Sequence, residues 1–295
     1  MTHKLFIIGN GFDLHHGIPS RYSDFGTYVE AADPAVARLI NDYLFVDENF
    51  WNCFEERLAT FDSDLVIDHA EQFLMPYSAE DWSDAYHHDF EYEIGEVVRG
   101  LSNTMRSRFA EWIRMLPIPV PGAAPTVRCI DLAATFLTFN YTPTLQQLYG
   151  VPDDQVLHIH GRAADPDSAI VLGHGWERRT EEMMTPAIDE NTDTRVAEGY
   201  HLIDGYFADT FKPTAQILAQ NRTWFDRLAG VSDVWVLGHS LADVDAAYLH
   251  EIAHRVAPST RWTVSYHGND SHARAQIASF GVAANLATYA PLASL

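Results

Sequence analysis

Several glycine-rich stretches carry polar side chains at positions suited to phosphate binding or catalysis. The first, Leu5 to Phe25, reads LFIIGNGFDLHHGIPSRYSDF and places Gly9, Gly11 and Asp13 directly after an apolar run. Glycine turns between a buried strand and a helix are suited to binding an anion, because the first amides of the helix have no intrahelical partner, although some are only tight connections. The chain therefore has a candidate anion site near its start, with a carboxylate inside it.

This turn departs from the dinucleotide fingerprint of hydride-transfer enzymes. The fingerprint places a third glycine where this chain has Leu14, and no acidic strand end follows about 20 residues later. An anion site without hydride transfer remains. For Asp13 we weigh two roles: capping free amides near the positive end of the helix dipole, or holding a ribose hydroxyl or orienting His160.

Other apolar stretches also end in residues that could contact a ligand. Asn140 ends TFLTFN, His160 ends QVLHIH, and Gly238 ends DVWVLG. In an open parallel sheet, residues just past the carboxyl ends of the strands line the crevice in which ligands bind. We therefore expect these three residues to lie with Gly9 at one edge of a sheet.

The elements that hold these residues alternate between strands and helices. A strand at residues 5–8 leads into a helix from about Asp13, and the proline-rich run at 117–125 interrupts helical structure. Strands are predicted at 126–132, 135–141, 155–161, 168–175, 233–240 and 261–267, and helices at 214–230, 243–256 and 271–281. This pattern predicts an α/β fold with an open, mostly parallel, Rossmann-like sheet.

The long segment after the first turn has a different pattern. From about Thr27 to Met115, apolar residues recur at steps of three and four, which indicates helices. We predict a Rossmann-like nucleotide-binding core at residues 1–26 and 123–295, with a helical insertion or lid at residues 27–122. Trp51, Phe54 and Glu55 share one helical face; the aromatic pair suits a core, and Glu55 could reach the pocket.

Composition narrows the function classes. The formal charge is -22, from 41 acidic and 19 basic residues, which opposes binding to nucleic-acid backbones. Cys53 and Cys129 are too few for a disulfide scaffold or a four-cysteine zinc site. The sequence shows no signal-peptide core and no apolar run near the roughly 18 residues of a spanning helix, so we expect a cytoplasmic protein without membrane partners.

The quoted motifs resemble two protein families. GNGFDLHHGIPSRYSDF, FWNCFEE, LTFNY and HIHG together resemble the AbiH-type phage abortive-infection proteins, over segments from residue 5 to about 245. A more distant resemblance is to the sirtuin-like NAD-binding core. It rests on Gly9-Asn10-Gly11, on Gly17-Ile18-Pro19 at the sirtuin-like spacing, on Asn140, on His160-Gly161 and on Gly238-His239-Ser240.

These resemblances imply a phage-defence protein whose sirtuin-like pocket binds and hydrolyses NAD or a related nucleotide. In it Asn140 places the ribose and the attacking water, His160 is the general base, and Asp13 is the third catalytic residue. The implied nucleotide-binding residues are Gly9, Asn10, Gly11, Phe12, Gly17, Arg21, Gly161, Gly238 and Ser240. The implied partner is a small-molecule nucleotide; no metal is expected, and a homo-oligomer and a phage-derived trigger are compatible with this role.

Differences from sirtuins limit what the resemblance implies. Deacylating sirtuins usually hold a structural zinc with two Cys-x-x-Cys pairs, which this chain lacks, so protein deacylation is not expected. Two other classes stay open: a non-catalytic nucleotide sensor, and a metal-dependent phosphoesterase or nuclease. The latter is suggested by His158, His160, His174 and His239, although His158 alternates with His160 and suits a packed position. Arg162, like Arg21, follows a key turn and could contact phosphate.

Overall fold

The computed structural model describes residues 3–80, 83, 86–187, 189–190 and 192–295. Its contacts divide the chain into two compact units. The sheet unit comprises Met1–Arg21, Ala110–Val171 and Pro213–Leu295, and the helical unit comprises Tyr22–Phe109 and Leu172–Lys212. Residues 172–212 thus group with the helices, whereas the sequence analysis placed them in the core. The lid role of the helical segment stays a prediction.

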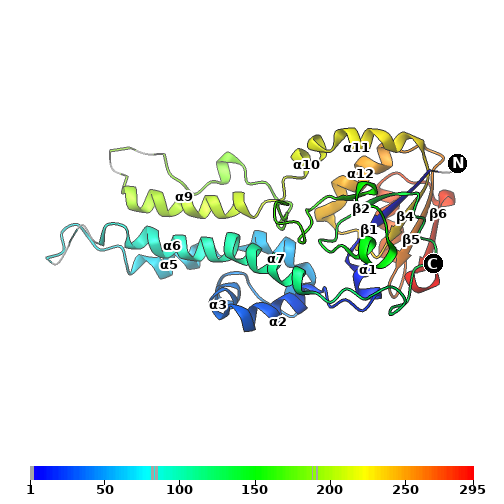
Figure 1. Cartoon of the computed structure of the whole chain (residues 1–295). Helices are drawn as coiled ribbons and strands as arrows, with labels where there is room; N and C mark the ends of the chain where they lie inside the picture. Colours follow the sequence, from blue (N-terminus) through cyan, green and yellow to red (C-terminus); the bar gives the residue numbers. More distant parts are fainter. Residues whose placement is uncertain (1–2, 81–82, 84–85, 188, 191) are drawn as a thin grey trace. The chain divides into compact units, whose positions relative to one another are not determined.

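The sheet unit is built on six parallel strands, counted over the described residues (Figure 1). They are β1 (His3–Ile8), β2 (Thr135–Thr138), β3 (Val156–His158), β4 (Val231–Leu237), β5 (Arg261–Tyr266) and β6 (Ala287–Pro291). The order is β3-β2-β1-β4-β5-β6, and each neighbouring pair is parallel. The predicted Rossmann-like sheet is confirmed, and its order reverses between β1 and β4, where such sheets bind ligands.

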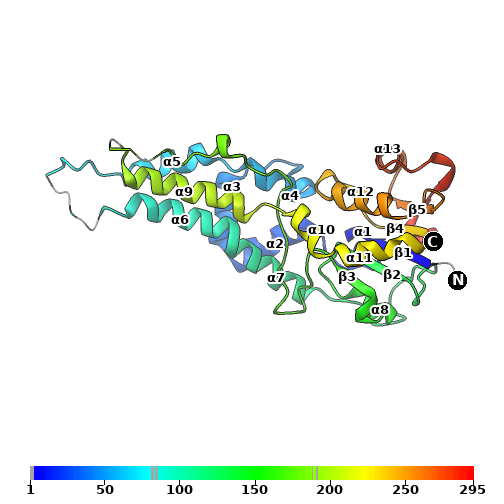
Figure 2. The ribbon, with the colours of Figure 1, turned by 90° about the horizontal axis from the view of Figure 1, so that it is seen from above.

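Helices cover both faces of this sheet (Figures 1 and 2). Leu5 and Ile7 of β1 pack in one core with α10 (Thr214–Gln220), α11 (Arg222–Asp226), α12 (Ala246–Arg255) and α13 (Ser271–Ser279). Phe6 and Ile8 pack in a second core with α1 (Asn10–His15) and α8 (Thr144–Tyr149). Alternate residues of β1 thus face two cores, which explains its unbroken apolar run.

Some predicted elements are wrong. Residues 126–132 are not a strand: the Val127 amide donates to the Tyr149 hydroxyl at 2.8 Å, and the Cys129 amide donates to the Leu295 carbonyl at 3.1 Å. Because these donors are bonded elsewhere, the segment has no need of a neighbouring strand. Residues 168–175 contribute one isolated bridge, from His174 to Phe211, instead of a strand. The predicted helix over 214–230 is interrupted at Asn221, and β6 was missed.

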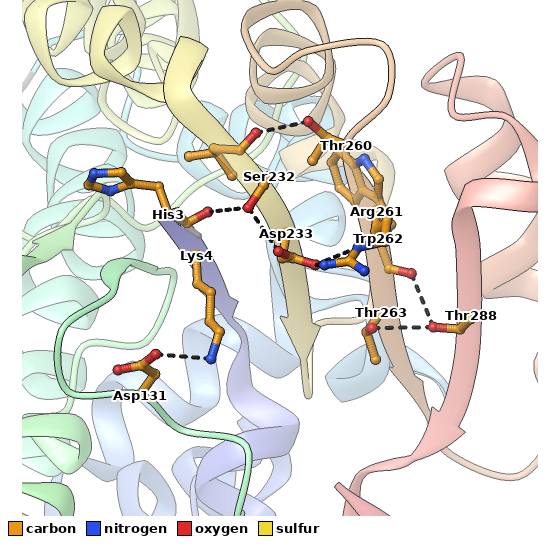
Figure 3. A network of polar contacts seen from close by, with 11 residues as sticks. His3, Lys4, Asp131, Ser232, Asp233, Thr260, Arg261, Trp262, Thr263 and Thr288 are labelled. Carbon is orange, nitrogen blue, oxygen red and sulfur yellow. Dashed lines mark hydrogen bonds and ion pairs between the residues drawn. The ribbon is translucent and has the colours of Figure 1, made fainter. Parts of the chain in front are cut away.

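A polar network lies toward the amino-terminal ends of the strands (Figure 3). The Lys4 ammonium donates to Asp131 at 2.9 Å, and the buried Thr260 hydroxyl donates to the Val231 carbonyl at 2.9 Å. Further contacts join Ser232 to His3 and Asp233, Arg261 to Asp233, and Thr263 to Thr288. These polar groups find their partners within the sheet unit itself.

The helical unit confirms the predicted run of helices. Its elements are α2 (Tyr22–Ala32), α3 (Pro34–Tyr43), α4 (Phe54–Arg57), α5 (Ser63–Glu71), α6 (Asp89–Arg99) and α9 (Thr194–Asp209), and α7 (Met105–Met115) begins in it. Helices α6 and α9 lie side by side (Figures 1 and 2), and a Cβ at Gly199 would come within 2.5 Å of the Phe90 ring. No helix among the described residues has the length and apolarity to cross a membrane.

Candidate functional site

The glycines of the first turn permit a close backbone approach. A Cβ at Gly9 would lie 2.5 Å from the His239 Cα, and one at Gly11 would lie 2.8 Å from the Gly238 oxygen. Gly238 itself has a φ of 64°, and a Cβ there would lie 2.1 Å from the Phe12 nitrogen. The Gly11 amide donates to the Gly238 carbonyl at 2.7 Å. The turn therefore packs directly against the residues that follow β4. One of its amides, that of Gly11, already donates a hydrogen bond within the protein.

The remaining residues of this turn stabilise its shape. The side-chain nitrogen Nδ2 of Asn10 donates a hydrogen bond to the Ser20 carbonyl at 2.7 Å. The Ser20 hydroxyl donates one to the Asn10 side-chain oxygen at 2.6 Å. These bonds tie the turn to the loop that begins at Gly17, whose φ is 77°. Phe12 lies fully inside the second core, and Arg21 is exposed. Ligand contacts by these residues stay predictions.

Asp13 and Asn140 come together at the carboxyl edge of the sheet. Asp13 is 1% exposed, and its Oδ2 accepts a hydrogen bond from the Thr142 hydroxyl at 2.6 Å. Burial raises the pKa of Asp13 to about 6, and the nearby Thr142, Thr144 and Asn140 side chains oppose part of this rise. Its carboxylate does not cap α1, since no side chain does so. Thr142 thus joins the end of β2 to α1.

Two polar atoms of this pair are buried without a hydrogen bond. Among the described residues, Oδ1 of Asp13 and Nδ2 of Asn140 have no partner, although Asn140 lies near enough to lower the Asp13 pKa. Buried polar atoms in proteins are nearly always hydrogen-bonded, so such exceptions call for a cause. One acceptor and one donor side by side are suited to a hydroxyl-bearing ligand.

His158 fixes the backbone next to Asn140. Its Nδ1 lies 3.0 Å from the Asn140 carbonyl oxygen, and its Nε2 lies 3.0 Å from the Gln146 amide nitrogen. The amide donates to Nε2, so the Nδ1 hydrogen is donated to the carbonyl. Burial lowers the pKa of His158 to about 4, which keeps the ring neutral at pH 7. His158 therefore positions the end of β2, in keeping with the predicted packed role.

His160 lies in a second polar group beside the first. Its Nε2 is 3.7 Å from Oδ1 of Asp245, and Nε2 of His239 is 3.7 Å from Oδ2 of the same carboxylate. The Phe139 ring contacts both imidazoles, with centroids 5.2 Å from His160 and 4.4 Å from His239. Asp245 is thus a carboxylate that faces His160, and the orienting role considered for Asp13 stays a prediction. The two groups meet just after β2, where Phe139 precedes Asn140 in the chain.

Other predicted residues follow the same strand ends. Gly161 has a φ of 89°, and a Cβ there would lie 2.2 Å from the Ala169 oxygen. Arg162 pairs with Asp153 at 3.0 Å, and the exposed Ser240 accepts a hydrogen bond on its carbonyl from His272 at 3.0 Å. None of these contacts tests a ligand role.

Glu55 belongs to a buried network of the helical unit. It accepts hydrogen bonds from the Tyr22 hydroxyl and from the Lys212 ammonium, whose side chain is fully buried. Its neighbour Phe54 is core, as predicted, and Trp51 packs over Gly26. Glu55 thus has a clear role as the partner of a buried lysine.

The metal hypothesis rests on three histidines of the sheet unit and on one, His174, of the helical unit. His174 belongs to the helical unit, where it is buried beside Trp176, Phe207 and Phe211, and burial lowers its pKa to about 4. His158 is hydrogen-bonded, and His160 and His239 share Asp245. Over the described ranges, no group of three or more His, Cys, Asp or Glu residues has metal-binding geometry.

Sequence reasoning missed Thr142, Asp245 and Lys212. Thr142 follows Asn140 by two residues, a spacing that could have marked it. Asp245 precedes α12 directly and was read as part of that helix. Lys212 carries no local signal, because its partner is 157 residues away in the chain.

Comparison with known proteins places these residues in a family context. The family model described as Bacteriophage abortive infection AbiH matches residues 5–266, which include all the site residues named above. Searches of curated proteins and of solved structures found no significant match. Because the match covers most of its length, the chain belongs to the AbiH family of bacteriophage abortive-infection proteins.

Proposed function

We propose that this chain acts in phage abortive infection by binding NAD at the carboxyl edge of its sheet and hydrolysing the bond between nicotinamide and ribose. Family membership supports the role in abortive infection. The nucleotide and the reaction are inferred from the site and from the sirtuin-like motifs. Depletion of NAD would stop the metabolism on which phage replication depends.

The observation that carries this proposal is the buried pair formed by Asp13 and Asn140. Asp13 Oδ1 can accept a hydrogen bond and Asn140 Nδ2 can donate one, and neither has a partner among the described residues. Adjacent hydroxyls of a ribose supply both a donor and an acceptor. The pair lies one strand away from the reversal between β1 and β4, where a Rossmann-like sheet binds nucleotides.

The same residues are suited to breaking an N-glycosidic bond. Positive charge develops on the ribose as the neutral nicotinamide departs, and the Asp13 carboxylate, with a pKa of about 6, is largely ionised at neutral pH to stabilise that charge. A water molecule then forms the new C–O bond while the C–N bond breaks. His160 accepts the proton of that water, and nicotinamide and ADP-ribose are the products.

Nicotinamide release from NAD by the purified full chain tests the proposal. We expect release by the wild type with and without chelator, and a decrease of ~10²–10⁴-fold in His160→Ala, the usual contribution of a positioned general base. His254→Ala is the matched control, because His254 is exposed on α12. Its activity should equal that of the wild type.

Three results would overturn parts of the proposal. Saturable NAD binding without nicotinamide release would favour a nucleotide sensor. Loss of release on chelation, with recovery on adding a divalent metal, would favour metal-dependent hydrolysis. Unchanged turnover in His160→Ala would remove this histidine from the reaction.

A further inference from the structure

His239 is held in one tautomer by the backbone. The Leu241 amide donates a hydrogen bond to Nδ1 of His239 at 2.9 Å. A ring nitrogen that accepts a hydrogen bond carries no proton, so His239 is neutral and its hydrogen is on Nε2. That Nε2–H faces Oδ2 of Asp245 across 3.7 Å.

The donor of this bond has a strained backbone. Leu241 is 1% exposed and has a φ of 59°, in the left-handed region that residues other than glycine rarely adopt. Such a conformation is energetically unfavourable and persists where the surrounding structure enforces it, often at functional sites. The direction of the Leu241 amide is therefore maintained against a local cost.

Asp245 continues the chain of polar contacts to His160. Its Oδ2 faces the Nε2–H of His239, and its Oδ1 lies 3.7 Å from Nε2 of His160. The Phe139 ring packs nearly perpendicular to both imidazoles, at 82° and 79°, and limits their rotation. The Leu241 amide, His239, Asp245 and His160 thus form a continuous series of polar contacts, in that order.

We propose that Leu241, His239 and Asp245 form a positioning chain that keeps the proton of His160 on Nε2, so that Nδ1 is the atom that accepts the proton of the attacking water. The inference rests on the proposed NAD hydrolysis and adds the reacting atom and three positioning residues. As the C–O bond forms, the water proton moves to Nδ1, and Asp245 stabilises the resulting imidazolium. The 3.7 Å separations exceed a hydrogen bond, and we expect them to shorten when substrate binds, as is common for catalytic contacts.

The Asp245→Asn substitution tests the chain through kinetics. It preserves shape and removes the charge that stabilises the imidazolium, so kcat should fall ~10–100-fold, as for other partners that orient a histidine. The KM for NAD should change little, because Asp245 does not contact the ribose in this scheme. Asp243→Asn is the matched control, since Asp243 is exposed on the same turn.

The pH profile adds a readout that a purely structural role would not change. The titratable groups placed around His160 by its contacts are Asp245, Tyr248 and Tyr141, with His239 on the far side of Asp245. Loss of the Asp245 charge should shift the acid limb of the kcat profile to lower pH, because His160 then loses its proton more readily. If Asp245→Asn leaves both kcat and the acid limb of the pH profile unchanged, the proposed positioning chain is wrong.

Substitutions at His239 test the middle of the chain. A glutamine can present an N–H donor to Asp245, whereas a leucine of similar volume cannot. We expect His239→Gln to retain more activity than His239→Leu, with similar thermal unfolding for both. Equal activity of the two variants would exclude a donor role for His239.

Imidazole ¹⁵N NMR separates failure of this inference from failure of the proposed function. In the full chain without substrate, both His160 and His239 should show the Nε2–H tautomer, and Asp245→Asn should reduce its population at His160. An Nδ1–H tautomer at either histidine would overturn the positioning chain even if NAD is cleaved. The expected tautomers in a protein that releases no nicotinamide would instead overturn the proposed reaction.

Discussion

At the amino-terminal end of the sheet, Lys4 meets Asp131 and the buried Thr260 hydroxyl meets a backbone carbonyl (Figure 3). At the carboxyl end, Asp13 Oδ1 and Asn140 Nδ2 are buried and have no hydrogen-bond partner among the described residues. An unmade buried hydrogen bond costs about 1–3 kcal/mol, so the second arrangement lowers stability. The polar groups at the amino-terminal end thus support the fold, whereas those at the carboxyl end are the ones to which the proposed function assigns a ligand.

The largest expected effect comes from separating the backbones at the carboxyl end. Gly238→Ala adds a Cβ 2.1 Å from the Phe12 nitrogen, at a φ of 64°. We expect the free energy of unfolding to fall by about 3 kcal/mol or more, from steric overlap and backbone strain together. Urea unfolding measures it. Gly205→Ala is the control, since a Cβ there meets nothing within 4 Å; a similar loss in both variants would contradict the close-approach argument.

Removing the buried negative charge of Asp13 at the carboxyl end should increase the free energy of unfolding at neutral pH. The Asp13 pKa is raised from 3.8 to about 6 in the folded state, so between those values the folded chain binds more protons than the unfolded chain. The free energy of unfolding therefore falls as pH rises from about 4 to 6, by up to about 3 kcal/mol at 1.36 kcal/mol per unit.

Asp13→Asn should remove this pH dependence. At pH 7.5 the variant should be more stable than the wild type, and the difference should vanish near pH 4, as measured by urea unfolding across that range. Its NAD cleavage should fall, because a neutral amide stabilises positive charge poorly. Identical pH slopes for the two proteins would show that Asp13 is not desolvated.

A buried hydroxyl at the amino-terminal end should affect stability alone. Thr260→Val keeps the shape but leaves the Val231 carbonyl without its 2.9 Å hydrogen bond. We expect a loss of about 1 kcal/mol in the free energy of unfolding, with NAD cleavage unchanged. Altered nicotinamide release in a folded Thr260→Val chain would contradict the division of roles between the two ends.

The smallest effect is expected at the partly exposed ion pair of the same end. Lys4→Met removes the ion pair with Asp131. The Lys4 side chain is 29% exposed and the Asp131 side chain is 39% exposed. The loss should be about 0.5 kcal/mol in low salt and smaller at 1 M salt, because solvent and ions screen such pairs. Thermal unfolding at two salt concentrations measures it, and a loss above about 2 kcal/mol would show a larger structural role.

Much of the sheet unit follows from local sequence. The apolar run at residues 5–8, the stretch ending at Leu237 and the stretch at 261–266 are strands because alternate residues can be buried on both faces. The segment at 126–132 has similar composition but is not a strand. Its amides are bonded by the Tyr149 hydroxyl and the Leu295 carbonyl, partners that lie far along the chain.

The candidate site divides in the same way. Position after a strand was enough to select Gly9, Asn140, His160 and Gly238, because parallel strands bring their carboxyl ends to one edge. It could not select Asp245 as the partner of His160, since that contact depends on how α12 packs against the sheet. Position after a strand also could not reveal that the Gly11 amide donates a hydrogen bond to the Gly238 carbonyl.

The sequence by itself determined most of the strand and helix types, the parallel sheet and the edge at which polar residues gather, because these depend on local apolar patterns and turn residues. The tertiary structure alone decided which carboxylate faces which histidine, which amides are already bonded, and which buried atoms lack a partner. Many of those properties arise between residues far apart in the chain, such as His160 and Asp245 or Asp13 and Thr142. Burial then sets their energies, since removing water raises the Asp13 pKa to about 6.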